Sequence, residues 1–423
     1  MASGFVTAAA PQRAQVDACI QCGLCLPHCP TYRLTGQERY SPRGRLSAMS
    51  AVLEGIATVD EAFDDALSTC LGCRACEAVC PGLVPYGPAL EGVRAEITTQ
   101  RPNIGRRVRR VLLGRGLGWR GGLRGGSALL AFVQRARLGV VMPASVRRTL
   151  SGVRPLDPGR RGWAGRSVAS HGAARGKVVL LTGCVMDQWF GPVHDATVGV
   201  LTRAGYEVVA PASQTCCGAL AAHDGHTADA RRLAQANLEA LSGADLVVSD
   251  SAGCTAHLKE YGHWAPGGEA FAAGVRDVTE LVAELIDQGA LPEFPPSGMD
   301  VAIQDPCHLR HVQRIVDQPR RLVRAAGYTP VEIDPDGLCC GAAGIYSILQ
   351  PEASHQLGAR KADQVVATGA ALVASANPGC EMQLRSHLGG AYRVVHPIEL
   401  YWESLARGGA PSNDGRDAIV SPR

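Results

Sequence analysis

The sequence lacks the patterns that mark a membrane-spanning protein, a secreted protein or a nucleotide-binding enzyme. No stretch approaches the roughly 18 uninterrupted apolar residues that a transmembrane helix needs. Residues 1–15 hold no basic segment ahead of an apolar one, so we expect no secretory signal. We find no phosphate-binding loop and no nucleophilic-serine elbow. These absences predict a chain that leaves bond chemistry on an organic substrate to another protein.

A strong net charge is missing as well. The chain has 42 basic and 39 acidic residues, and its formal charge of +3 is too close to neutral to indicate nucleic-acid binding by itself. Its 423 residues, 46% of them hydrophobic, suffice for about two to four domains with cores of their own.

Cysteine, by contrast, is abundant. Half of the 16 cysteines lie in two copies of the pattern C-x2-C-x2-C-x3-C-P, at residues 19–30 and 70–81. This is the bacterial pattern for a pair of [4Fe–4S] clusters, in which three thiolates of a run bind one cluster and the fourth binds the other. The predicted ligands are Cys19, Cys22, Cys25 and Cys80 for the first cluster, and Cys70, Cys73, Cys76 and Cys29 for the second.

Two other uses of cysteine fit this pattern less well. Structural zinc takes four ligands, commonly as separated pairs, and a disulfide framework is typical of small secreted domains. Thiolate ligands need reducing conditions, so we predict a cytoplasmic protein. Any association with the inner face of the cell membrane would come through a surface or a partner, since no transmembrane segment is expected.

The chain between the two runs predicts helices. Apolar residues recur at helical spacing from Leu46 to Leu67, and Pro42 suits the start of a helix. A closing helix is expected over residues 86–97. We therefore predict that residues 1–100 form an α-helical ferredoxin domain with two clusters, and not the small β-hairpin type.

Residues 101–161 hold fifteen Arg, no Lys and a single acidic residue, Asp157. We assign residues 101–175 to an Arg/Gly-rich helical linker. Its arginines fit a solvated linker, a docking surface for an acidic partner or anionic lipid, or, least well, a nucleic-acid site, since interleaved aromatic residues are few. The G-x-G-x-x-G match at Gly116, Gly118 and Gly121 does not lie between a strand and a helix, so we discount it.

An internal repeat contains the other eight cysteines. Each copy has an apolar strand ending in a cysteine, then 31 residues, then Cys-Cys-Gly, a helix, a further strand and a last cysteine. Strands that alternate with helices predict parallel α/β domains, at residues 176–296 and 297–407, followed by a flexible tail at 408–423. The carboxyl ends of such strands share one edge, where the cysteines should meet. They are Cys184, Cys216, Cys217 and Cys254 in the first copy, and Cys307, Cys339, Cys340 and Cys380 in the second.

These eight cysteines have three possible uses. They could bind a further cluster in each copy, cycle between dithiol and disulfide, or be buried as small apolar residues. The glycine after each Cys-Cys pair would let the backbone approach a cofactor closely. His223, His308 and His311 lie near these cysteines in the sequence, and each is a candidate ligand or N–H donor to a sulfur.

At this point the residues resemble a known family. Two ferredoxin-type runs followed by two Cys-Cys-Gly domains are similar to the iron–sulfur subunit of bacterial glycolate oxidase. The resemblance is closest in the second copy and weaker in the first, and it leaves out residues 101–161 and the last fifteen or so. The segments that carry it are 305–309, 339–351, 377–384 and 396–400, with 183–184, 216–220 and 251–254 in the first copy.

The resemblance implies a role and a set of partners. Glycolate, and also D-lactate, would be oxidised on FAD in partner subunits, and this chain would relay the electrons to a membrane quinone or other acceptor. Related chains serve lactate utilisation and anaerobic glycerol-3-phosphate oxidation, so the substrate is not decided by this sequence. The implied fold is α+β and multidomain, with a helical two-cluster ferredoxin domain followed by two parallel-sheet cysteine-rich domains.

One departure separates the chain from a similar family. Heterodisulfide reductase subunits end each Cys-Cys-Gly domain with a C-x-x-C pair, but Ser251 and Asn377 replace the first cysteine of that pair here. Five-thiolate ligation is therefore not available. Two alternatives to an electron-transfer subunit stay open: a thiol–disulfide reductase working at the Cys-Cys-Gly sites, and a docking scaffold whose C-terminal cysteines bind nothing.

Overall fold

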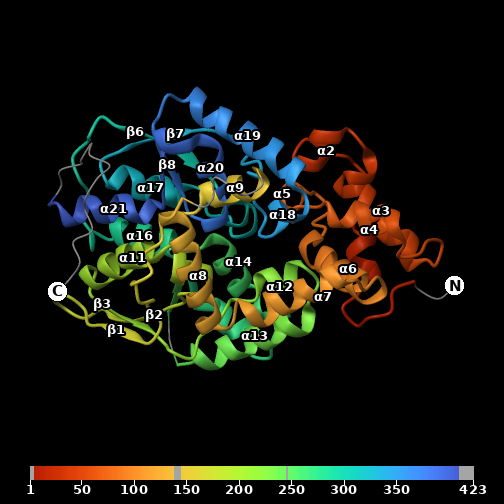
Figure 1. The fold of residues 1–423 in the computed structure, drawn as a ribbon, viewed down its shortest axis with the longest axis horizontal. Coiled ribbons are helices and arrows are strands. Elements are labelled where there is room, and N and C mark those ends of the chain that lie inside the picture. Colours follow the sequence, from red (N-terminus) through yellow and green to blue (C-terminus); the bar gives the residue numbers. More distant parts are fainter. Residues whose placement is uncertain (1–3, 138–143, 244–245, 409–423) are drawn as a thin grey trace.

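The computed structural model describes residues 4–137, 144–243 and 246–408. A helical N-terminal domain is followed by a helical connection and two α/β domains, which Figure 1 shows side by side. The fold class predicted from the sequence is confirmed. The expected flexible tail lies outside the described residues, apart from Gly408.

The N-terminal domain is built from short helices with clear start signals. Pro42 occupies the first turn of α3, and the hydroxyl of Ser41 accepts a hydrogen bond from the backbone N–H of Gly44 at 3.0 Å. Met49 and Leu67 are fully buried in its core, each contributing about 2 kcal/mol by burial. The helices are α1 (Arg13–Asp17), α2 (Pro30–Thr35), α3 (Pro42–Leu53), α4 (Glu61–Ser68), α5 (Ala75–Ala78) and α6 (Tyr86–Gln100), with a 3-10 turn at Glu38–Tyr40.

The Arg-rich stretch is mostly helical. It forms α7 (Ile104–Val111), a π-helical turn (Leu112–Gly116), α8 (Arg120–Arg135) and α9 (Ala144–Gly152). A short strand, β1 (Arg166–Val168), then pairs antiparallel with β3 (Tyr206–Ala210). The first sheet therefore reaches back into the stretch that the sequence assigns to the linker, because three residues among Arg and Gly give no strand pattern.

The first α/β domain holds a five-stranded sheet in the order β1-β3-β2-β4-β5, parallel except at β1. All of β4 and the last three residues of β2 are buried, as expected for parallel strands that are packed on both faces. The remaining strands are β2 (Gly176–Leu180), β4 (Val247–Ser249) and β5 (Val275–Asp277), and the helices are α10 (Val185–Trp189), α11 (Gly191–Arg203), α12 (Ala219–His223), α13 (Thr227–Ala240), α14 (Ala252–Lys259), α15 (Gly268–Ala273) and α16 (Val278–Asp287), with a 3-10 turn at Tyr261–His263.

The second α/β domain repeats this topology. Its four strands are all parallel, in the order β7-β6-β8-β9, which corresponds to β3-β2-β4-β5 in the first domain. The strands are β6 (Asp300–Gln304), β7 (Thr329–Glu332), β8 (Leu372–Ser375) and β9 (Arg393–Val395), and the helices are α17 (Asp317–Ala325), α18 (Tyr346–Leu349), α19 (Pro351–Ala367), α20 (Pro378–Leu388) and α21 (Pro397–Ala406), with a π-helical turn at His308–Val312 and a 3-10 turn at Gly389–Ala391.

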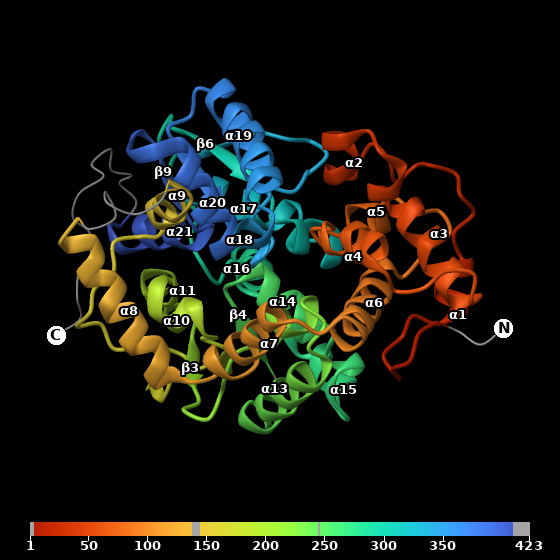
Figure 2. The ribbon, with the colours of Figure 1, turned by 45° about the vertical axis from the view of Figure 1, so that its right-hand side comes forward.

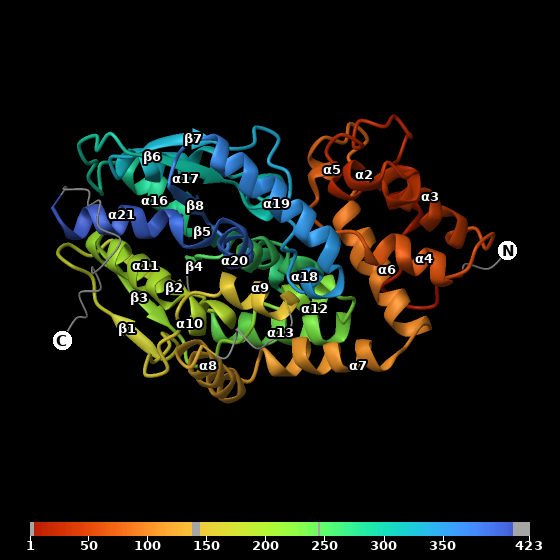
Figure 3. The same cartoon turned by 45° about the horizontal axis from the view of Figure 1, so that its top comes forward.

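The two α/β domains share one hydrophobic core. Helices α11 and α16 of the first pack against α17 and α21 of the second, and Figure 3 shows α21 between the two sheets. Gly199 on α11 leaves space that the ring of Trp402 on α21 fills, because a Cβ there would lie 2.4 Å from a ring atom. The repeat is therefore folded as one packed pair of domains.

The N-terminal domain docks onto the first α/β domain through polar contacts. Arg74 pairs with Glu260 at 2.5 Å, and Arg94 donates to the carbonyl of His223 at 2.8 Å. Gly225 lies so close to the backbone of Arg94 that a Cβ would come within 2.3 Å of its carbonyl oxygen. These contacts fix how the ferredoxin motifs face the repeat. No helix among the described residues is long and apolar enough to cross a membrane.

Candidate metal and thiol centres

The eight cysteines of the two N-terminal runs line two adjoining hollows. The first hollow is lined by Cys19, Cys22, Cys25 and Cys80, and the second by Cys29, Cys70, Cys73 and Cys76. Cys76 lines both hollows, so the two spaces are neighbours. Each hollow is thus lined by three cysteines of one run together with cysteines of the other run, Cys76 and Cys80 in the first hollow and Cys29 in the second.

The donor chemistry of these hollows fits iron–sulfur cubes. Each is lined by four or more thiols and otherwise mainly by apolar side chains and backbone, and soft thiolates are the ligands of such clusters. Within the described ranges, no three His, Cys, Asp or Glu side chains converge closely enough to hold a single metal ion. Thiols spread around a space suit a multi-iron cube better than one zinc ion.

A buried arginine that the sequence motif does not reveal lies beside the second hollow. Arg45 is 1% exposed, and its guanidinium lies 4.0 Å from the sulfur of Cys29 and donates to the carbonyl of Ala66 at 2.7 Å. Burial would raise the pKa of Cys70, but the charges of Arg45 and Arg94 outweigh it and hold that pKa below its ordinary value. Arg45 therefore favours thiolates in a site that would otherwise be too apolar for them.

In the first copy of the repeat, the cysteines meet in two pairs at the carboxyl ends of the strands. The sulfurs of Cys184 and Cys216 are 3.6 Å apart, and those of Cys217 and Cys254 are 3.2 Å apart. Cys216 accepts hydrogen bonds from the thiols of Cys184 and Cys217, and this lowers its pKa, whereas Cys217 donates to its neighbours and its own pKa is raised. Gly218 has φ +95, a backbone conformation that favours glycine and explains the third residue of the motif.

The second copy has the same arrangement. Cys339 is hydrogen-bonded to Cys307 and Cys340, and this lowers the pKa of both partners and raises that of Cys339. Cys340 also contacts Cys380. A thiolate beside a thiol is the form in which cysteine binds metal or attacks a disulfide, so both copies are chemically competent.

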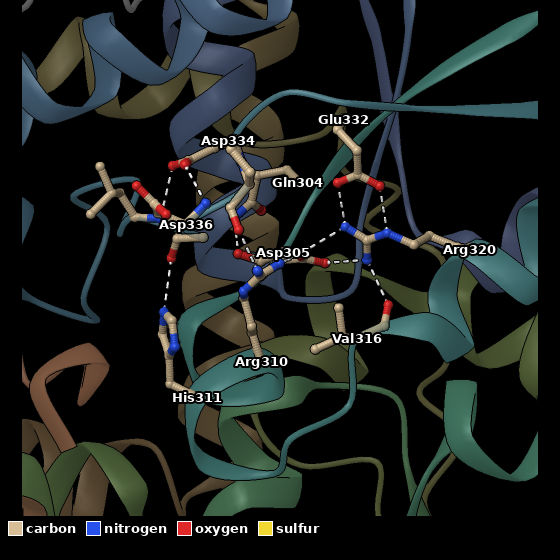
Figure 4. Close-up of polar contacts among 12 residues, drawn as sticks. Gln304, Asp305, Arg310, His311, Val316, Arg320, Glu332, Asp334 and Asp336 are labelled. Atoms are coloured by element: carbon tan, nitrogen blue, oxygen red, sulfur yellow. Dashed lines mark hydrogen bonds and ion pairs between the residues drawn. The ribbon is translucent and has the colours of Figure 1, made fainter. Parts of the chain in front are cut away.

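Two ion-pair networks hold the loops of the second copy. Asp305, two residues before Cys307, accepts from Arg310 at 2.6 Å and from Arg320 at 2.9 Å, and Arg320 also pairs with Glu332 (Figure 4). Asp334, just after β7, accepts from the ammonium of Lys361 at 2.6 Å. The backbone N–H of Leu338, next to Cys339, also donates to Asp334 at 2.8 Å. Each network fixes the backbone beside one of the thiols.

Polar residues occupy the positions of the absent fifth thiols. The side chain of Asn377 donates to the sulfur of Cys380 at 3.5 Å and accepts from the backbone N–H of Gly253 at 3.2 Å. Ser251 is the N-cap of α14, and its backbone carbonyl accepts a hydrogen bond from the hydroxyl of Thr255. Asn377 thus links the cysteine-bearing helix starts of the two copies, a structural use of a position that cannot bind metal as a thiolate.

Three histidines connect the cysteines of the first copy (the first thiol cluster) with those of the second copy (the second thiol cluster). One of them, His257, was not identified from the sequence. His308 lies 3.7 Å from the sulfur of Cys307 and stacks on His223 with ring centroids 5.3 Å apart. His223 binds Glu91 of α6 at 2.9 Å and lies edge-on to His257 at 6.3 Å. His257 contributes to the lowered pKa of Cys216. Neither His257 nor Glu91 belongs to a recognisable motif, so only the fold reveals them.

The third predicted histidine has another partner. His311 contacts the backbone carbonyl of Gly337 through Nε2 at 3.0 Å (Figure 4). It therefore binds the loop that leads to Cys339 and Cys340. Of the three candidates, His308 is the one that the structure places beside a thiol.

His257 should give the protein a pH-dependent stability. Burial lowers the pKa of His257 to about 4, below the value of about 6.5 expected for the unfolded chain. Because the unfolded state then binds more protons, stability falls as the pH falls, by about 2 kcal/mol between pH 7 and pH 5. We expect the His257→Phe variant to lose this part of the pH dependence in thermal unfolding.

The variant should not be less stable than the parent at neutral pH. Neither ring nitrogen of His257 has a hydrogen-bond partner within the described part of the chain, so an apolar ring loses no bond. An unchanged pH dependence in the His257→Phe variant would contradict this account.

The second thiol cluster touches the second hollow of the N-terminal domain. Cys73 belongs to one buried apolar cluster with Cys339 and Tyr346, and Cys307 packs against it. Burial raises the pKa of Cys73, and the charge of Cys307 adds to this effect. Burial also raises the pKa of Tyr346, to which the charges of Cys70 and Cys339 contribute. Figure 2 shows α5, which carries Cys76, next to the second α/β domain. The first thiol cluster belongs to a different apolar cluster.

Comparison with known proteins identifies the same parts. A family model described as 4Fe-4S dicluster domain matches residues 15–84, and one described as cysteine-rich domain matches twice, at residues 178–259 and 301–385. A protein of Bacillus subtilis (strain 168) named probable glycolate oxidase iron-sulfur subunit is 36% identical over 415 residues, which cover 91% of this chain and 93% of that protein.

Two further relatives differ in extent. The glycolate oxidase iron-sulfur subunit of Escherichia coli (strain K12) is 30% identical over 410 residues, 92% of this chain and 94% of that protein. Lactate utilization protein A of Oceanobacillus iheyensis is 30% identical over 233 residues, 53% of this chain and 96% of that protein. The similarity to the first two spans the Arg-rich stretch as well, which the sequence motifs alone did not cover.

Proposed function

This chain belongs to the family of glycolate oxidase iron–sulfur subunits, and we propose that it is the electron-transfer subunit of a glycolate dehydrogenase complex. Glycolate would be oxidised to glyoxylate, and D-lactate to pyruvate, on FAD-binding partner subunits, with a membrane quinone as the final acceptor. The observation that carries this proposal is the pair of adjoining cysteine-lined hollows beside a further thiol cluster. Such a row of redox-capable centres suits electron transfer.

We assign the two hollows to [4Fe–4S] clusters, each of which would carry one electron at a time when bound. The arrangement of the thiols supports the predicted ligand sets. Cys19, Cys22, Cys25 and Cys80 would hold the first cluster, and Cys29, Cys70, Cys73 and Cys76 the second.

The partner flavoprotein would dock at the rim of the first hollow. Cys22 is exposed, and the rim carries the exposed apolar side chains of Ile20 and Leu24, with Leu83 close by in the chain. Exposed apolar side chains grouped around one feature are typical of an interaction surface. The four thiols that line the second hollow are all buried, so the first hollow is the accessible end of the row.

The Cys-Cys-Gly site of the second copy would be the electron carrier that follows the second cluster. It packs against Cys73, whereas the first site belongs to a different apolar cluster. We expect the double variant Cys339→Ser with Cys340→Ser to slow reduction of the acceptor at least about tenfold, equivalent to about 1.4 kcal/mol in the barrier. The measurement is glycolate-dependent reduction of a quinone analogue by the whole complex.

The matched control is Cys216→Ser with Cys217→Ser in the first copy, which should slow the reaction less. Equal rates in the parent and in the Cys339/Cys340 variant would contradict an electron-transfer role for the second site and favour a scaffold. The parent complex itself tests the proposed function: flavoprotein subunits that reduce the quinone analogue equally fast without this chain would contradict it.

A second candidate function is thiol–disulfide reduction at the Cys-Cys-Gly sites. The 3.2 Å separation of the sulfurs of Cys217 and Cys254 favours it, because these thiols are close enough to form a disulfide after small movements. Ser251 and Asn377 count against it, since heterodisulfide reductases have cysteine there. Turnover of a disulfide substrate by the isolated chain would distinguish this activity from electron transfer within a complex.

A further inference from the structure

Helix α7 is oriented with its charged side toward the protein. Arg106 pairs with Asp64 at 2.5 Å, Arg109 with Asp224 at 3.0 Å and Arg110 with Asp229 at 3.1 Å. The π-helical turn that follows is held closely, because Arg232 donates to the carbonyl of Gly114 and a Cβ at Gly114 would lie 2.6 Å from Asp229. The arginines of this helix therefore attach it to the N-terminal domain and the first α/β domain.

The apolar side of the same helix faces solvent. Ile104, Val108, Val111 and Leu112 follow the i, i+4, i+7, i+8 spacing of one helical stripe, and their side chains are 51–81% exposed. A surface helix normally buries such a stripe and exposes its charges. Because α7 does the reverse while it is firmly held, its exposed stripe indicates a partner outside the chain.

Helix α8 continues this surface along one edge of the molecule, as Figure 3 shows. Trp119, Leu129 and Phe132 are all more than 60% exposed. The ring of Trp119 lies against the start of α8, where a Cβ at Gly122 would come within 2.3 Å of it. Seven of the fifteen large apolar side chains that are exposed in the described residues lie between residues 104 and 132.

The charge of this edge indicates the chemistry of the partner. Residues 101–137 contain ten arginines and no acidic residue. Those that remain exposed without an ion pair to any described residue include Arg107, Arg115, Arg124 and Arg135. Aromatic and aliphatic side chains next to unpaired arginines, on helices that lie along a surface, are typical of proteins bound to the interface of an anionic membrane.

We propose that α7 and α8 dock this chain on a membrane surface that contains anionic lipids. The apolar stripe would enter the boundary between headgroups and acyl chains, and the unpaired arginines would contact lipid phosphates. This proposal extends the proposed function, since it would bring the chain to a membrane acceptor. It differs from the flavoprotein contact, which we place at the rim around Ile20, Leu24 and Leu83.

The test is sedimentation of the full chain with vesicles of phosphatidylcholine that contain about 30% phosphatidylglycerol, against pure phosphatidylcholine. We expect binding to the anionic vesicles at low salt, which weakens as salt screens the charges. Val108→Gln with Leu112→Gln should weaken binding at least about tenfold by removing apolar burial. Arg107→Gln with Arg115→Gln should weaken it about thirtyfold at low salt.

The matched control is Ile56→Gln with Val366→Gln, which removes two apolar side chains elsewhere that are 69% and 53% exposed and should leave binding unchanged. Absence of binding to anionic vesicles, or equal loss in the control, would overturn the proposal. So would a Val108/Leu112 variant that keeps lipid binding and loses the flavoprotein, because the edge would then be a protein interface. Lipid binding is measured without electron transfer, so its failure leaves the proposed function untouched.

Discussion

Replacing Cys22 and Cys80 together with serine is expected to remove one [4Fe–4S] cluster and leave the other intact. Both thiols line the first hollow, although they come from different runs. The double variant should therefore keep about four of the roughly eight iron atoms per chain that two clusters supply. Iron and acid-labile sulfide on anaerobically purified protein, with EPR of the reduced sample, measure this directly.

The matched variant is Cys73→Ser with Cys80→Ser, which takes one thiol from each hollow. If the fourth cysteine of each run binds the other cluster, this variant should lose nearly all its iron, because both sites are left with three thiols. The opposite pattern, with iron retained in the Cys73/Cys80 variant and lost in the Cys22/Cys80 variant, would mean that each run binds its own cluster. Zinc in place of iron would contradict both assignments.

Much of this architecture could be predicted from the sequence because its signals are local and repeated. The cysteine spacing indicates two clusters, and the two Cys-Cys-Gly copies indicate two parallel sheets with thiols at one edge. The corresponding strand orders around β2 and β6 follow from that repeat. Left-handed backbone at Gly218 and Gly341 explains why glycine follows each cysteine pair.

Residues that act through tertiary contacts could not be predicted in this way. Arg45, Glu91 and His257 are single residues without a motif, and each becomes relevant only because packing brings it to a thiol or a histidine. The strand β1 is too short to show alternation. Cys73 and Cys339 belong to one apolar cluster although they lie far apart in the chain, and no spacing rule relates them.

The Arg-rich stretch shows how composition alone leaves a choice open. The sequence gives fifteen arginines but not which of them bind the protein itself. In the structure, the connection is held to the three domains by ion pairs of Arg106, Arg109 and Arg154. By contrast, no ion pair to a described residue is made by Arg107 or Arg115. One segment therefore combines the structural linker with the surface that we propose to bind anionic lipid.

Replacing Arg154 with methionine is expected to destabilise the second α/β domain by about 3–5 kcal/mol, because it leaves two buried carboxylates without a counter-charge. Arg154 makes paired hydrogen bonds of 2.5–2.7 Å to both Glu381 and Glu399, and all three side chains are at most 12% exposed. Burial opposes ionisation of Glu399, but Arg154 outweighs it and lowers the pKa of that carboxyl to about 2. Urea or thermal unfolding of the full chain measures the loss.

Acid should reduce this loss. Without Arg154, burial raises the pKa of Glu399, so the variant takes up a proton on folding and recovers stability as the pH falls from about 7 toward 5. The control Arg107→Met removes an exposed arginine without an ion pair to a described residue and should change stability by no more than about 0.5 kcal/mol. Similar losses in the two variants would show that the bridge from the linker to Glu381 and Glu399 contributes little. A larger loss of stability in the Arg154 variant, which becomes smaller in acid, would show that the charge of Arg154 holds the Arg-rich connection to α20, the helix that contains Cys380.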